Sequence, residues 1–266
     1  MSDDLVIPST LTVGSLSAAL GLSASQRESL VTLVQGKHES EKKRKRSGAA
    51  KVPAGAAGGA KRVGHRVRRT GETSVEVSIA LDRQTGVSMS TGPLAPGTVS
   101  VHTGLGFLDH MLTALAKHGQ FSLGVQAVGD LHVDDHHTVE DVGITMGLAI
   151  KDALGVRAGI RRWGTGFAPL DEALARAVVD VSSRPGAFID LQLTRPMIGN
   201  VSTEMLSHFM ESLATSAELT VHVDVLRGTN DHHKAECAFK ALALALREAF
   251  SISGDATDVP STKGVL

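Results

Sequence analysis

The chain has 266 residues, 42% of them hydrophobic, and its 27 Lys and Arg nearly balance its 28 Asp and Glu. This length and composition predict a globular protein of one or two domains. A single cysteine, Cys237, excludes an intramolecular disulfide. No apolar run in the sequence approaches the roughly 18 residues of a membrane-spanning helix, so we expect no membrane association.

The charge is unevenly distributed along the chain. Residues 37–69 hold 12 Lys and Arg against Glu39 and Glu41, whereas residues 70–266 hold 14 Lys and Arg against 23 Asp and Glu. Residues 41–69 are rich in Lys, Arg, Gly and Ala, which cannot bury enough apolar surface to offset the entropy of ordering. We therefore predict a basic, mostly disordered leader over residues 1–69 and a catalytic domain over residues 70–266.

The leader contains the run KKRKR, which is typical of nuclear import or of polyanion binding. The alternative is a solvated tail without a partner, and we favour that interpretation. The N-terminus opens with acidic residues and lacks the basic start of a secretory signal. We expect a cytoplasmic protein, with an organelle as the alternative because the leader also holds Ala, Ser and Arg.

Apolar residues in the first half follow strand and helix periods in turn. Residues 74–82 (SVEVSIALD) alternate as a half-buried strand does, and residues 98–102 predict a second strand. The stretch TGPLAPG between them predicts a hairpin-type connection. A helix over residues 107–118, a strand over 121–128 and a helix over 138–154 follow.

The second half repeats this order. We predict strands over residues 173–181 and 187–193, a helix over 203–217, a strand over 220–226 and a helix over 234–250. An internal duplication of about 100 residues explains the repetition, with the halves at 70–160 and 161–266. The pattern predicts an α+β fold in which the helices of each half cover one face of a largely antiparallel sheet.

Ten of the 12 histidines follow residue 70, and six of them form two matched patterns. In each half, one histidine lies on the first predicted helix, and His-His-x-x-Glu opens the second helix 24 or 26 residues later. The first half has His110, His136, His137 and Glu140, and the second has His208, His232, His233 and Glu236.

Helix geometry limits how these residues share metal ions. Residues three or four apart lie on one helix face, so Glu140 can join His136 or His137 at one ion. Neighbouring residues point about 100° apart, so His136 and His137 are expected to bind different ions. We predict two metals, or metals shared between subunits. The mixture of imidazole and carboxylate suits Mn, Fe, Co, Ni or Zn, and six-coordination favours Mn or Fe.

Six motifs occur in order: GFLDHM, GDLHVDDHHTVED, APLDEALARAVVDVSSRP, STEMLSH, NDHHKAECAFKALALALR and PSTKGVL. In combination they resemble imidazoleglycerol-phosphate dehydratase, a hydro-lyase of histidine biosynthesis, over residues 70–266. The resemblance implies a duplicated fold of the ribosomal protein S5 domain 2-like type. It also implies a homo-oligomer of 24 subunits built from trimers, with two Mn²⁺ ions per active site held at subunit interfaces.

The resemblance assigns roles by position. All eight His and Glu residues of the two patterns are implied metal ligands. Glu72 matches a glutamate near the substrate. The implied phosphate and substrate contacts are Arg162, Arg184, Lys240, Ser261 and Lys263.

The implied reaction removes water from imidazoleglycerol phosphate and yields imidazole acetol phosphate. Our hypothesis is that the metals bind the ring as imidazolate, which expels the neighbouring hydroxyl and gives a diazafulvene-like intermediate. A base must take and return a proton. The candidates are Glu72, Asp109, Asp171 and Glu172, and Glu72 is favoured because it opens the first strand and matches the family.

Three alternatives remain open from the sequence. A two-metal hydrolase of phosphate esters would share the His/Glu cluster and the cations. A non-catalytic metal-storage or assembly protein would bind metal without turnover. Nucleic-acid binding rests on the basic leader alone.

Overall fold

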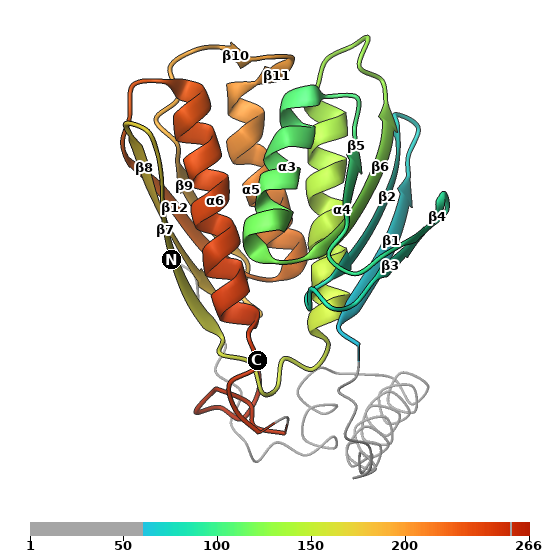
Figure 1. The fold of residues 1–266 in the computed structure, drawn as a ribbon, viewed down its shortest axis with the longest axis vertical. Helices are drawn as coiled ribbons and strands as arrows, with labels where there is room; N and C mark the ends of the chain where they lie inside the picture. Colours follow the sequence, from blue (N-terminus) through green and yellow to red (C-terminus); the bar gives the residue numbers. More distant parts are fainter. Residues whose placement is uncertain (1–60, 256) are drawn as a thin grey trace, which may run out of the picture. The chain divides into compact units, whose positions relative to one another are not determined.

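The computed structural model describes residues 61–255 and 257–266. The described residues form two halves of matching element order (Figure 1). The first half contains β1 (Val63–Arg69), β2 (Thr73–Ala80), β3 (Val87–Met89), β4 (Gly92–Leu94), β5 (Val99–His102), α3 (Gly106–Gly119), β6 (Ser122–Gly129) and α4 (His136–Leu154). The second contains β7 (Trp163–Leu170), β8 (Ala173–Asp180), β9 (Gly186–Asp190), β10 (Met197–Ile198), β11 (Val201–Ser202), α5 (Thr203–Ala217), β12 (Thr220–Arg227) and α6 (Asp231–Phe250).

The two main sheets have the same topology. The strand order is β1-β2-β6-β5 in the first half and β7-β8-β12-β9 in the second. In each sheet the first three strands are antiparallel, and the fourth pairs parallel to its neighbour. A helix connects the two parallel strands in both halves, α3 in one and α5 in the other. The matching topology confirms the predicted duplication.

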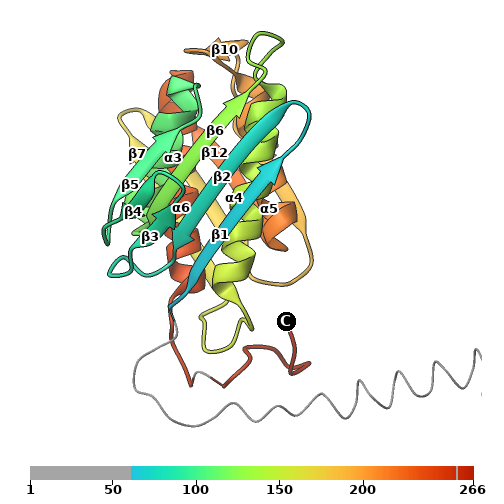
Figure 2. The ribbon, with the colours of Figure 1, turned by 90° about the vertical axis from the view of Figure 1, so that its right-hand side faces the viewer.

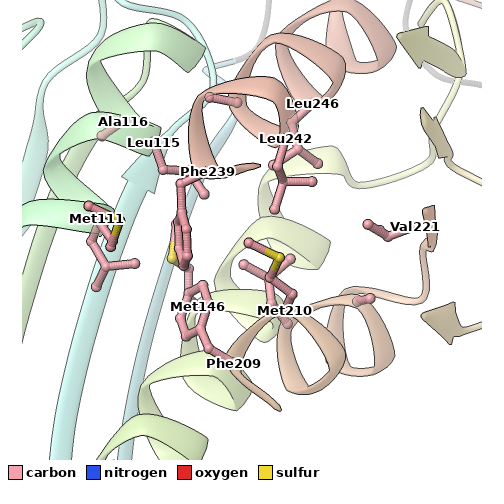
Figure 3. Close-up of a cluster of buried hydrophobic side chains, with 14 of the residues drawn as sticks. Met111, Leu115, Ala116, Met146, Phe209, Met210, Val221, Phe239, Leu242 and Leu246 are labelled. Carbon is pink, nitrogen blue, oxygen red and sulfur yellow. The ribbon is translucent and has the colours of Figure 1, made fainter. Parts of the chain in front are cut away.

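The helices of both halves lie between the two sheets (Figures 1 and 2). Helix α4 packs on the first sheet and α6 on the second, while α4 contacts α5 and α3 contacts α6 across the middle. Figure 3 shows the buried side chains where the halves meet, among them Phe209 of α5 and Phe239 of α6, whose rings stack with centroids 5.8 Å apart. Burial of this shared core joins the two halves into one unit.

Val63–Arg69 corrects the predicted domain boundary. The sequence interpretation placed these residues in the disordered leader, but they form β1, paired with β2 along its whole length. The basic side chains serve the fold: Arg66 forms an ion pair with Asp152 of α4, and Arg68 with Asp141, each at 2.6 Å. The folded part therefore begins before residue 70. The KKRKR run and the rest of residues 1–60 lie outside the described residues.

Strand β7 was also missed by the sequence interpretation. Its inward positions are the small residues Gly164, Gly166 and Ala168, whereas Trp163 and Phe167 point outward and are exposed. This reverses the usual rule that the larger apolar residues mark the buried face. The other predicted strands and helices are confirmed with shifted ends, and the TGPLAPG stretch forms part of the β3–β4 hairpin.

None of the helices in the described ranges is both long and apolar enough to cross a membrane.

Candidate metal centre

Two clusters of possible metal ligands lie near the N-terminal ends of the helices. One is formed by His110, His232 and Glu236, the other by His208, His136 and Glu140. In each cluster the candidate ligand atoms lie within 4.8 Å of one another. Both clusters, called here the triads, contain two imidazoles and one carboxylate.

Each triad combines the two halves of the chain. His110 of α3 lies 3.0 Å from the Glu236 carboxylate of α6, and His208 of α5 lies 2.9 Å from that of Glu140 in α4. Within α6, His232 lies 3.2 Å from Glu236, as expected for residues four apart on a helix. The sequence left open which histidine joins which pair, and only the packing of α3 on α6 and of α5 on α4 decides it.

Lys240 makes the two triads electrostatically different. Its Nζ lies 2.7 Å from Glu236 Oε1, one turn earlier on α6. Burial opposes ionisation of Glu236, but the hydrogen bonds from Lys240 and His110 outweigh it and lower its pKa to about 2. The corresponding position after Glu140 is Ile144. A lysine therefore pairs with the glutamate of one triad, whereas the equivalent position in the other half is apolar.

Aspartates that precede the ligand histidines hold the helix starts in place. Asp135 accepts hydrogen bonds from the Ser202 backbone and hydroxyl at 2.6 and 3.0 Å, which joins the start of α4 to that of α5. Asp231 accepts from the backbone N–H of Arg195 at 2.7 Å. Asp109 accepts from the Thr103 backbone N–H at 2.8 Å. Asp109, one of the base candidates, thus anchors the start of α3.

His137 and His233 lie outside the triads. The Nδ1 atom of His137 lies 3.0 Å from Asp130 Oδ2, and that of His233 lies 2.7 Å from Glu172 Oε2. Hydrogen bonding to Asp130 raises the pKa of His137, and hydrogen bonding to Glu172 raises that of His233. As the helix geometry predicted, neighbouring histidines do not join one cluster.

The other three candidate bases, Glu72, Asp171 and Glu172, lie at the strand turns beside these two histidines. Glu72, between β1 and β2, lies 3.6 Å from His137 Nε2, and Asp171, between β7 and β8, lies 3.8 Å from His233 Nε2. Glu172 accepts hydrogen bonds from His233 and from the Asn230 backbone, and these lower its pKa well below the usual range. Glu72 and Asp171 are exposed, with 54% and 74% of the side-chain surface accessible.

The implied phosphate contacts other than Lys240 lie at the end of the folded domain opposite to the triads. Arg162 precedes β7 and Asp171 follows it, and eight strand residues span roughly 26 Å. Arg162 pairs with Asp180 at 2.8 Å and donates to the Pro260 carbonyl at 2.7 Å, next to Ser261. Arg184 is exposed in the turn after β8, and Lys263 is exposed in the C-terminal segment seen at the bottom of Figure 1. Within a single chain, these residues therefore do not reach the triads.

Two contacts near the triads were not foreseen. Asp130, the partner of His137, lies seven residues before it in GDLHVDDHH, and its acidity in a histidine-rich loop was the available signal. Phe107, near the start of α3, also packs its ring against that of His232 in a T-shaped arrangement, with centroids 5.2 Å apart.

The fold and the site define a class: a protein of two matching sheet–helix halves whose helices bring together two sets of candidate metal ligands, each of two His and one Glu. The family model "Imidazoleglycerol-phosphate dehydratase" matches residues 103–246. The chain belongs to the imidazoleglycerol-phosphate dehydratase family, and it is a hydro-lyase.

Curated relatives carry the same family name and match at high identity. The imidazoleglycerol-phosphate dehydratase of Candida glabrata is 59% identical over 208 residues, which cover 75% of this chain and 97% of the relative. That of Saccharomyces cerevisiae is 52% identical over 219 residues, covering 75% and 96%.

Solved structures of the family share the fold. The Staphylococcus aureus enzyme superposes with a TM-score of 0.61 at 33% identity and covers 72% of this chain and 99% of its own. The Pyrococcus furiosus enzyme gives 0.62 at 34% identity, covering 76% and 100%.

Proposed function

We propose that this chain converts imidazoleglycerol phosphate to imidazole acetol phosphate in histidine biosynthesis, at a centre of two Mn²⁺ ions completed by neighbouring copies of the chain. The observation that carries the proposal is the pair of triads. Each triad contains two imidazoles and one carboxylate, and in each the residues come from both halves of the chain. The family membership supports the reaction.

The donor set fits a six-coordinate divalent ion. Imidazole and carboxylate together suit Mn²⁺ among other first-row metals, and three donors leave three positions of an octahedron open. His110, His232 and Glu236 would hold one ion, and His208, His136 and Glu140 the other. When bound, the ions supply Lewis-acid polarisation of the substrate ring and a template for its orientation.

His137 and His233 would each give a fourth ligand to an ion of a neighbouring copy. Both are partly exposed, with 32% and 27% of the side-chain surface accessible, and neither reaches the triads of its own chain. The same assembly would let Arg162, Arg184, Ser261 and Lys263 of one copy approach the triads of another. We propose a 24-subunit assembly built from trimers, in the cytoplasm, with subunits of the ribosomal protein S5 domain 2-like fold; family membership supports the assembly size and the fold.

The outer face of the second sheet supports association between copies. Trp163, Phe167 and Phe188 point from this face and are 53%, 54% and 57% exposed, although the chain has only seven Phe and one Trp. Exposed aromatic surface of this kind is typical of protein interfaces.

Glu72 is the proposed base. Its exposed carboxylate stands beside His137 Nε2, where it could take the proton from the side-chain carbon of the substrate and return it after the hydroxyl leaves. Asp171 occupies the matching place beside His233. Glu172 is less suited, because both of its oxygens are engaged by hydrogen-bond donors.

The test uses the purified full chain, stripped with a chelator and then reloaded with MnCl₂. We expect ketone formation from imidazoleglycerol phosphate only after reloading, together with assembly to a large oligomer by light scattering. Release of inorganic phosphate without ketone would instead support a two-metal phosphate-ester hydrolase. Metal-dependent assembly without turnover would support a storage or assembly protein.

A further inference from the structure

The two histidines outside the triads share one arrangement. In each, Nδ1 is hydrogen-bonded to a carboxylate, Asp130 for His137 and Glu172 for His233, at 3.0 and 2.7 Å. In each, Nε2 faces a second carboxylate that lies beyond hydrogen-bond distance, at 3.6 and 3.8 Å. One ring nitrogen is therefore fixed, and the other remains available to a ligand.

The duplication by itself does not produce this match. Asp130 comes from the loop that leads from β6 into α4, whereas Glu172 comes from the turn between β7 and β8. These positions are not equivalent in the two halves. The two halves therefore form the same carboxylate–Nδ1 hydrogen bond from non-equivalent positions. Duplication of an ancestral half does not explain this hydrogen bond, so its function requires an explanation.

The contacts of Asp130 and Glu172 do not suit either carboxylate to act directly on the substrate. Asp130 is largely buried, and within residues 61–255 and 257–266 its Oδ1 accepts no hydrogen bond, which leaves His137 as the side-chain partner. A buried carboxylate oxygen that accepts no hydrogen bond destabilises the folded state. We therefore look for a role of the Asp130 charge at its partner His137. Oε1 of Glu172 accepts from the Thr229 and Asn230 backbone at 3.1 and 2.8 Å, so its other oxygen, Oε2, is directed at His233.

We propose that Asp130 and Glu172 are positioning residues that hold His137 and His233 with Nε2 directed outward to a metal ion of a neighbouring copy. This inference rests on the proposed function. A carboxylate that accepts from Nδ1–H sets the tautomer and ring orientation and makes Nε2 a stronger donor, and its loss typically weakens metal binding by roughly 10- to 100-fold.

The test measures Mn²⁺ binding to the chelator-stripped full chain by isothermal titration calorimetry. Asp130→Asn and Glu172→Gln are each expected to weaken one class of Mn²⁺ site by roughly 10- to 100-fold. The matched control is Glu211→Gln: its carboxylate lies 3.8 Å from Nδ1 of the triad histidine His208, too far for a hydrogen bond. We expect the control to keep the parent affinity.

A double-mutant cycle separates positioning from structural damage. If Asp130 acts through His137, Asp130→Asn adds less than about a twofold loss in a His137→Ala background. The same holds for Glu172→Gln in a His233→Ala background. Parent-like affinity in the single variants, an undiminished loss in the histidine-free backgrounds, or an equal loss in the Glu211 control would overturn the inference. A parent chain that binds no Mn²⁺ would instead refute the proposed function.

Discussion

A close approach between a strand and a helix in the second half gives a quantitative prediction. A Cβ added at Gly166 of β7 would lie 2.1 Å from the Ala241 carbonyl oxygen of α6 and 2.9 Å from the Ala245 nitrogen. Both are backbone atoms and cannot turn aside. The substitution Gly166→Ala therefore requires β7 and α6 to separate by roughly 1 Å to restore ordinary contact distances.

The expected loss of stability follows from two opposing effects. Overpacking of this kind costs about 1–3 kcal/mol, and the rigid backbone contact places Gly166→Ala near the upper end. Replacing glycine stiffens the unfolded chain and returns about 0.4–1 kcal/mol. The net loss is about 2 kcal/mol. With a urea dependence of about 2–3 kcal/mol per molar, the unfolding midpoint falls by roughly 0.7–1 M.

Urea unfolding is followed by circular dichroism at one fixed protein concentration, because association adds to the apparent stability. Gly186→Ala is the control: its added Cβ would meet the Phe188 ring at 3.4 Å, an ordinary contact. We expect the control to stay within about 0.5 kcal/mol of the parent or to exceed it slightly. If Gly166→Ala unfolds at the parent midpoint, the strand–helix contact does not limit this part of the fold.

Three further predictions concern charge and ligands. Burial of Glu76 is outweighed by hydrogen bonds from Ser90 and His65, which lower its pKa. Its stabilisation is therefore complete above the ordinary value of 4.5 and is lost as the pH falls through the lowered one. Glu76→Gln should lower stability at neutral pH and approach the parent in urea unfolding as the pH falls through the lowered pKa of Glu76; a deficit that does not shrink with falling pH contradicts this. Lys240→Met should raise the KM for imidazoleglycerol phosphate by roughly tenfold or more, with a smaller change in kcat, and an unchanged KM contradicts the proposed phosphate contact. His208→Ala should remove one of the two Mn²⁺ ions per chain in metal analysis, whereas His102→Ala, an exposed histidine at the end of β5 and outside both triads, should retain both; full occupancy in the first variant contradicts the triad.

The sequence was most informative where periodicity and chemistry agree. The helix periods of α4 and α6 and the matched His-His-x-x-Glu patterns predicted the duplication and all six triad residues. The sequence-based prediction failed for strands whose buried positions are not marked by large apolar residues. β1 carries basic residues that pair with α4, and β7 buries glycine under α6, so neither shows the alternation of large apolar residues expected of a strand.

Sequence alone determined which side chains are candidate metal ligands and which neighbours point in different directions, because helix geometry fixes the directions of residues one, three and four apart. Tertiary structure alone decided that His110 joins Glu236 and that His208 joins Glu140, since these contacts cross between the halves and depend on how helices pack. It also directed His137 and His233 away from both triads and placed Arg162 at the far end of β7. The physical reason is that local spacing constrains directions along one element, whereas partners more than 60 residues apart are set by burial of a shared core.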